Sequence, residues 1–202
     1  MKLLCTVTYF ILLISASVCW AQDSDESVAL DSPTYFPIGS VSEFEQTWYA
    51  SHLSAMEEPT LQAEEDTEYF ALRVLYLPTW GRPIAFRYEI RNGTATRRAV
   101  ILSGFGGYAP GKIRDDVSSD VSSEDMAELL LALEDSGYWD LSEQDEVSGT
   151  DGSQLIIETV RSKEHRVFVR WTPEHEPGTR GLTKLVDFYK SEFTDFGFWG
   201  IN

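Results

Sequence analysis

The stretch from Ile84 to Ser103, IAFRYEIRNGTATRRAVILS, decides the fold class. Apolar and polar residues alternate on both sides of Asn92-Gly93, which is typical of strands with one buried face. Asn-Gly favours a two-residue hairpin loop, because a type I′ turn needs positive φ at both central residues. The stretch therefore predicts an antiparallel hairpin with strands on either side of residues 92–93.

Upstream, residues 67–77 (TEYFALRVLYL) are largely apolar at both alternating sets of positions. This pattern predicts a central strand that is covered on both faces. Before it, Ser42 and Glu45 form a capping box that predicts the start of a helix. His52 lies beside the apolar stripe of this helix and is interpreted as structural. The residues predicted to face the core are Phe44, Trp48, Tyr49, Leu53 and Met56.

Downstream, residues 112–121 predict another strand, and residues 123–136 predict a helix that Gly137 ends. A second hairpin is expected over 154–161 and 165–171, and a last amphipathic helix follows from Leu182. Strands do not alternate with helices, so a doubly wound fold is not expected. Residues 40–202 are predicted to form a single α+β domain, in which antiparallel β-hairpins form a sheet packed by about three helices.

The first 21 residues have the layout of a secretory signal peptide. A basic start precedes an apolar run, and small residues at 19 and 21 suit cleavage after Ala21. An uncleaved membrane anchor and a lipoprotein acylated at Cys19 are the alternatives. Residues 22–39 are acidic and read as a flexible leader. We therefore expect a secreted or periplasmic protein that has no transmembrane span after signal cleavage.

Composition excludes several classes of function. Both cysteines, Cys5 and Cys19, lie in the signal segment, so the mature chain has no disulfide, thiol nucleophile or thiolate metal site. The net charge of −17 argues against nucleic acid, since phosphate binding needs a basic face. Two kinds of partner remain possible after these exclusions. They are a protein, above all a basic one, and a component of the cell envelope.

The glycine-rich stretch LSGFGGYAPGK, residues 102–112, imitates two nucleotide-binding motifs without completing either. No helix begins directly after it, and Ile113 stands where a P-loop has Ser or Thr. We therefore expect no bound nucleotide. One interpretation is a bend between strands, with Phe105 and Tyr108 anchored in the core. In the other, the two rings line an apolar contact surface.

The hairpin near the C-terminus supplies the other candidate binding residues. Glu158 lies in an apolar strand and needs a cation, and Arg170 in the partner strand is expected opposite or diagonal to it. This pair is either a structural salt bridge or part of a binding cleft. We find no complete catalytic set, no metal-ligand spacing among the His residues and no cofactor motif. Further members of the candidate polar patch are Arg73, Arg87, Asp151 and Trp171.

Four stretches carry a resemblance to a known family. They are YFALRVLYLPTWGRPIAFRYEI, LSGFGGYAPGKI, GYWDL after a helix, and DGSQLIIETV with HRVFVRWTPE, and they cover most of residues 67–185. In the order of its G-x-G-G-Y-x-P-G and D-G-x-Q-hydrophobic-hydrophobic-E stretches, the chain resembles a family of uncharacterised exported bacterial proteins. The resemblance implies a bacterial source, which argues against glycosylation at the Asn92 sequon, and it implies no catalytic residue.

Two functions are carried forward from the sequence. The first is an exported, non-enzymatic binding or interaction protein, which suits the lack of a complete catalytic set. The alternative is an extracytoplasmic hydrolase that uses the carboxylates of the hairpin between Asp151 and Glu158. A carboxylate in a cleft would favour the hydrolase, and an exposed apolar patch would favour the binding protein.

Overall fold

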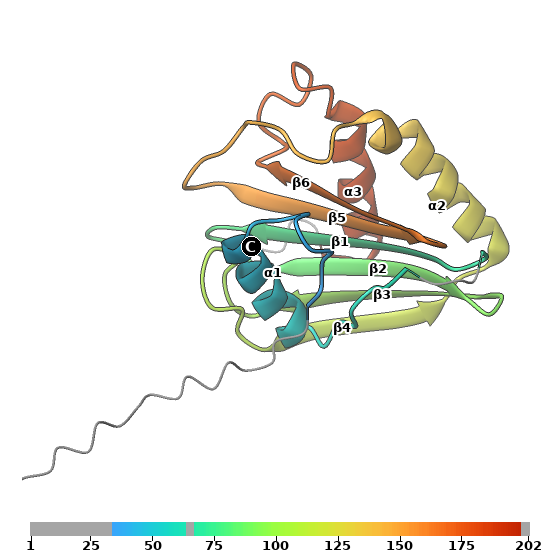
Figure 1. Cartoon of the computed structure of the whole chain (residues 1–202). Coiled ribbons are helices and arrows are strands. Elements are labelled where there is room, and N and C mark those ends of the chain that lie inside the picture. Colours follow the sequence, from blue (N-terminus) through green and yellow to red (C-terminus); the bar gives the residue numbers. More distant parts are fainter. Residues whose placement is uncertain (1–33, 64–66, 199–202) are drawn as a thin grey trace, which may run out of the picture. The chain divides into compact units, whose positions relative to one another are not determined.

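The computed structural model describes residues 34–63 and 67–198, so the predicted signal peptide and most of the predicted leader lie outside the described residues. The described part has three α-helices and one six-stranded antiparallel sheet (Figure 1), which confirms the predicted α+β class. The elements are α1 (Glu43–Ala55), β1 (Phe70–Pro78), β2 (Ile84–Arg91), β3 (Thr94–Leu102), β4 (Ile113–Asp120), α2 (Ser123–Asp135), the short 3-10 helix η1 (Tyr138–Asp140), β5 (Ser153–Arg161), β6 (Glu164–Trp171) and α3 (Thr183–Asp195).

The strand order in the sheet is β4-β3-β2-β1-β5-β6. Strands β1 to β4 form a meander, and the β5–β6 hairpin adds to it through pairing of β1 with β5. The turn between β2 and β3 has positive φ at both Asn92 (52°) and Gly93 (73°), as the Asn-Gly signal predicts. β1 lies inside the sheet and is buried along most of its length, which confirms the predicted central strand.

Helices cover both faces of the sheet. Leu72 and Val74 of β1 belong to the apolar core beneath α2 and α3. Leu75 and Leu77 of the same strand belong to a second core beneath α1. Because successive side chains of a strand point to opposite faces, one apolar strand serves both cores.

Helix α1 begins with the predicted capping box, in which the Ser42 hydroxyl and the Glu45 carboxylate each bond the other's backbone N–H. Tyr49 and Leu53 are buried as predicted, whereas Phe44 is 73% exposed, so its prediction as a core residue is wrong. An α-helix turns about 100° per residue, which places Phe44 about 140° around the axis from Tyr49. Its ring therefore faces away from the sheet.

Ordered packing begins before residue 40. Tyr35 and Phe36 are buried in the core beneath α1, and the Tyr35 hydroxyl donates a 2.9 Å hydrogen bond to the Glu58 carbonyl oxygen. The last part of the predicted leader thus belongs to the packed domain, because its aromatic rings have apolar surface to cover. Within 34–63 and 67–198, no helix is long and apolar enough to span a membrane.

Candidate functional site: an aromatic groove

Three loops converge at the end of the sheet where β1 ends. They are the β1–β2 turn, the glycine-rich loop between β3 and β4, and the loop that precedes β5. Backbone hydrogen bonds join them: Gly106 N–H to Gly81 O at 2.9 Å, Gly107 N–H to Thr79 O at 3.3 Å, and Thr79 N–H to Gly152 O at 2.8 Å. Main-chain bonds of this kind fix the loops against one another without depending on side chains.

The glycines of the β3–β4 loop are required by this close approach. A Cβ atom added to Gly106 would lie 2.6 Å from the Pro78 carbonyl oxygen, and one added to Gly107 would lie 3.0 Å from the Thr79 methyl group. Only a residue without a side chain lets the two backbones come this close. The loop is thus the bend between two strands that the sequence predicts.

Helix α1 packs across the same end of the sheet. The Trp48 indole N–H donates a 2.8 Å hydrogen bond to the Gly106 carbonyl oxygen. The fully buried His52 places Nε2 3.4 Å from the Phe105 carbonyl oxygen and Nδ1 3.0 Å from that of Trp48. Burial lowers the pKa of His52, so the ring is neutral at pH 7 and serves as a structural link.

Between α1 and the three loops lies a surface that we call the aromatic groove. It consists of two adjoining hollows of about 680 and about 360 Å³, which share Phe44, Trp48 and Gly149. Gly149 lies flat against the Trp171 ring, where any side chain would clash. The lining of the larger hollow also includes Thr47, Thr79, Tyr108 and Asp151, and that of the smaller hollow includes Glu45, Gln144, Asp145, Val147, Gln154 and Trp171.

The rings of the groove and its border are unusually accessible. Tyr108 is 54% exposed and packs against Trp80 with ring centroids 5.1 Å apart, and Phe44 packs against Trp48 at 5.9 Å. Phe105 is also about half exposed, so the interpretation that both rings anchor the glycine loop in the core is wrong. The close backbone contacts already hold this loop, which leaves its rings free to face solvent.

The ionisable side chains that line the groove are all acidic. Glu45 bonds Ser42 in the capping box, and Asp145 is paired with Arg180 at 2.9 Å and with Arg170 at 3.3 Å. Asp151 is different, because its carboxylate has no ion pair or hydrogen bond to any residue in the described ranges. Asp151 is therefore the acidic side chain of the groove that has neither a hydrogen-bond partner nor an ion-pair partner among the described residues, and it shares its hollow with aromatic rings.

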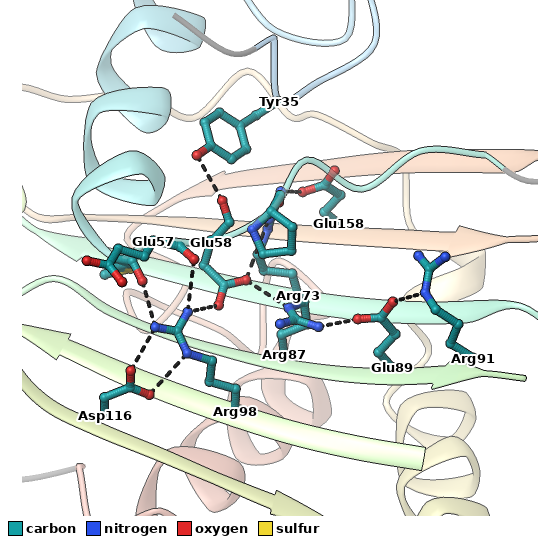
Figure 2. Close-up of polar contacts among 12 residues, drawn as sticks. Tyr35, Glu57, Glu58, Arg73, Arg87, Glu89, Arg91, Arg98, Asp116 and Glu158 are labelled. Atoms are coloured by element: carbon teal, nitrogen blue, oxygen red, sulfur yellow. Dashed lines mark hydrogen bonds and ion pairs between the residues drawn. The ribbon is translucent and has the colours of Figure 1, made fainter. Parts of the chain in front are cut away.

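A row of charged side chains crosses the face of the sheet that α1 covers (Figure 2). Arg98, Arg87 and Arg73 are direct partners on β3, β2 and β1, and Glu158 on β5 continues the row. Like charges in direct opposition repel. Glu58, buried in the loop after α1, offsets this repulsion with Oε2 2.9 Å from Arg87 Nε and Oε1 2.7 Å from Arg98 Nη1.

The arginines of this row also bind backbone. Arg98 donates to the Met56 carbonyl oxygen at 2.9 Å, and Arg73 donates to that of Pro59 at 2.6 Å. Glu158 pairs with Arg73 and lies 2.7 Å from Nε2 of His165, and it is 1% exposed. Glu158 is thus buried and has two side-chain partners, which fits the structural interpretation of the candidate patch. In this interpretation, the row attaches the loop after α1 to the sheet.

The predicted pairing of Glu158 with Arg170 is wrong. Glu158 pairs with Val167 across the hairpin, whereas Arg170 pairs with Leu155 on the opposite face. Arg170 instead donates to the Glu143 carbonyl oxygen at 3.0 Å and packs its guanidinium 3.9 Å from the Phe168 ring centre. The hairpin turn has two residues (162–163) where three (162–164) are expected, so the register differs by one residue. A shift of one residue moves a side chain to the opposite face of the sheet.

The structure divides the candidate residues into three groups. Tyr108, Asp151 and Trp171 line the aromatic groove, and Phe105 lies in the loop that forms one of its walls. Arg87 and Glu158 belong to the buried row, and Arg170 belongs to the loop contacts beside β6. Sequence reasoning missed two groove residues, Phe44 and Trp48. The available signal for them was their placement on the predicted helix.

A separate cavity of about 420 Å³ lies between α2, α3 and the sheet, and half of its lining residues are acidic. Its Glu192 accepts a 2.7 Å hydrogen bond from the Tyr88 hydroxyl, and burial raises the pKa of Glu192. In the described part of the chain, no group of three or more His, Cys, Asp or Glu side chains is placed to hold a metal ion. This cavity therefore offers hydrogen-bonding and charge but no metal centre.

Comparisons with known proteins do not assign this chain to a family. No protein-family model matches the sequence, and the curated proteins include no significant match. The functional argument therefore rests on the groove itself.

Proposed function

We propose that this chain is an exported, non-enzymatic binding protein, and that it takes a protein segment or a cell-envelope component in the aromatic groove. The observation that carries the proposal is Phe44, which is 73% exposed beside a hollow of about 680 Å³. Large exposed apolar surface beside a concave site marks a binding surface. The loops around it are fixed by backbone bonds, so the surface is organised before a ligand arrives.

Export is part of this proposal and rests on the N-terminal sequence. A mature chain that begins at Gln22 in the periplasm or the culture medium would support it, and N-terminal sequencing of the fractionated protein tests it. The kinship with exported bacterial proteins is likewise proposed from the glycine-rich and Asp151–Glu158 stretches.

The hydrolase alternative receives no support from the arrangement of its carboxylates. Asp151 and Glu158 are seven residues apart along a largely extended segment, a separation on the order of 20 Å at about 3.3 Å per residue. Paired catalytic carboxylates in glycosidases lie roughly 5–9.5 Å apart. Glu158 is also buried behind Arg73 and His165, so a substrate would not reach it.

A cross-linking pull-down tests the binding function. Mature wild-type chain is mixed with native periplasm or culture supernatant, in parallel with the double variant Phe44→Ala/Tyr108→Ala. Leu131→Ala is the matched control, because Leu131 is exposed and apolar on α2, which covers the other face of the sheet. We expect a stoichiometric component that the control retains and the double variant loses. Equal recovery by all three proteins would contradict the role of the groove.

A further inference from the structure

Resting on the binding function proposed above, we propose the chemistry of the ligand: a peptide segment of a partner protein that presents an Arg or Lys side chain to Asp151, between the rings of the aromatic groove. The larger hollow brings Phe44, Trp48 and Tyr108 together with Asp151. Aromatic faces attract cations, and a carboxylate beside them adds a direct ionic partner.

Charge complementarity selects a cationic ligand. The charged residues of the lining are Glu45 and Asp145 in the smaller hollow and Asp151 in the larger one, and the described lining contains no Lys or Arg. Asp145 already has two arginine partners, whereas Asp151 has none in the described chain. The whole chain carries a formal charge of −17, which attracts basic partners and repels acidic ones.

A second observation indicates that the ligand brings N–H donors. In the smaller hollow, Gln154 donates from Nε2 to the Tyr49 hydroxyl at 2.9 Å, but its Oε1 is buried without a hydrogen-bond partner in the described residues. A buried acceptor without a partner is costly in a folded protein. A peptide main-chain N–H would satisfy this oxygen.

The shape of the groove favours a chain over a compact ligand. The two hollows adjoin through Phe44, Trp48 and Gly149, so the surface extends from Asp151 in the larger hollow to Gln154 and Trp171 in the smaller one. An extended peptide places alternate side chains on one side, so a basic residue can reach Asp151 while its backbone passes Gln154.

Selection from a random dodecapeptide display library tests the inference. The library is panned in parallel on the wild-type chain, on Asp151→Asn and on Phe44→Ala/Tyr108→Ala. We expect wild-type chain to enrich peptides with Arg or Lys next to apolar residues, Asp151→Asn to lose the basic preference, and the double variant to enrich nothing. Enrichment of neutral or acidic peptides, or the same basic preference on Asp151→Asn, would overturn the inference.

The enriched peptide then gives a quantitative test. Replacing its Arg with citrulline, which is neutral and of similar shape, should weaken binding to wild-type chain about tenfold. Asp151→Asn should weaken binding of the Arg peptide about threefold, and should leave binding of the citrulline peptide unchanged. Equal weakening of both peptides by Asp151→Asn would contradict the proposed contact.

The two proposals fail in different ways. If no peptide is enriched, but Phe44→Ala/Tyr108→Ala still loses the component captured from the periplasm, the peptide inference is wrong and the binding function stands. A saccharide captured in that experiment has the same consequence. If the double variant changes neither experiment, the groove is not the binding surface and both proposals are wrong.

Discussion

The indole N–H of Trp48 on helix α1 hydrogen-bonds the carbonyl oxygen of Gly106 at 2.8 Å, across 58 residues of sequence. This bond attaches the helix that supplies one wall of the aromatic groove to the loop that supplies another. The same ring also lines the groove, so Trp48 contributes both to the stability of the fold and to the shape of the site.

Trp48→Phe should destabilise the protein, because it removes this hydrogen bond and leaves the Gly106 carbonyl without its donor. We expect the free energy of unfolding to fall by about 1–3 kcal/mol. Urea denaturation followed by circular dichroism measures the change. Trp80→Phe is the matched control, since Trp80 is exposed and its indole N–H has no partner in the described chain; it should change stability by less than about 0.5 kcal/mol. If Trp48→Phe and Trp80→Phe lowered the free energy of unfolding equally, the hydrogen bond would add nothing to stability.

Glu58→Gln should be among the most damaging conservative changes in the chain. It removes the negative charge that lies between Arg73, Arg87 and Arg98, and breaking a buried ion pair costs roughly 3–5 kcal/mol. The neighbouring Glu57→Gln is the control, because its side chain is exposed and only its carbonyl contacts Arg98. Thermal unfolding of both variants decides the matter: similar melting temperatures would mean that the arginines do not need Glu58.

Gly106→Ala should disrupt the junction of the loops, because the added methyl group would meet the backbone of Leu77 and Pro78 at 2.6 Å. We expect a loss of about 2–4 kcal/mol, comparable to other changes that force backbone to move. Gly178→Ala provides the comparison, since its nearest atom would be 3.9 Å away, at Thr183. A destabilisation by Gly178→Ala as large as that by Gly106→Ala would refute the close-approach argument.

His52 should make stability depend on pH. Burial lowers its pKa in the folded state below the value of 6.5 expected in the unfolded chain. The unfolded state therefore binds the proton more readily, so stability falls as pH decreases through about 6.5 and is unaffected above it.

The His52→Gln variant removes this titration. The difference in unfolding free energy between wild type and variant should change in favour of the variant between pH 7.5 and pH 5, by at most about 1.4 kcal/mol per pH unit. A difference that stays constant over this range would show that His52 does not titrate differently on folding.

Much of the fold could be predicted from local sequence. The alternation around Asn92-Gly93, the capping box at Ser42 and the stop at Gly137 each concern residues close in the chain, and the structure has the corresponding hairpin and helix ends. The side chains of Phe44 and Arg170 could not be placed in this way. Helical phase and hairpin register decide which way each side chain faces. An error of one residue turns a helical side chain by about 100°, and it moves a strand side chain to the opposite face of the sheet.

The groove could be predicted only in part. Tyr108, Asp151 and Trp171 were candidates because of residue type, but their proximity depends on three loops that are far apart in the sequence. Glu58 was missed as the partner of the arginines for the same reason, since nothing local distinguishes it from the other acidic residues of its loop. Contacts of this kind depend on tertiary packing.

The pairing of Arg73 with Glu158 has a consequence for folding. These residues are 85 positions apart, and they join the β1–β4 meander to the β5–β6 hairpin, each of which is continuous in sequence. A slip of one residue would turn Glu158 to the opposite face, and a slip of two would set Arg73 against Ile156 or Val160. Either misalignment leaves a buried charge without its counterion. The ion pair thus discriminates against misaligned intermediates at the one long-range strand pairing of the described sheet. Residues 34–198 contain no cysteine that could cross-link the two parts.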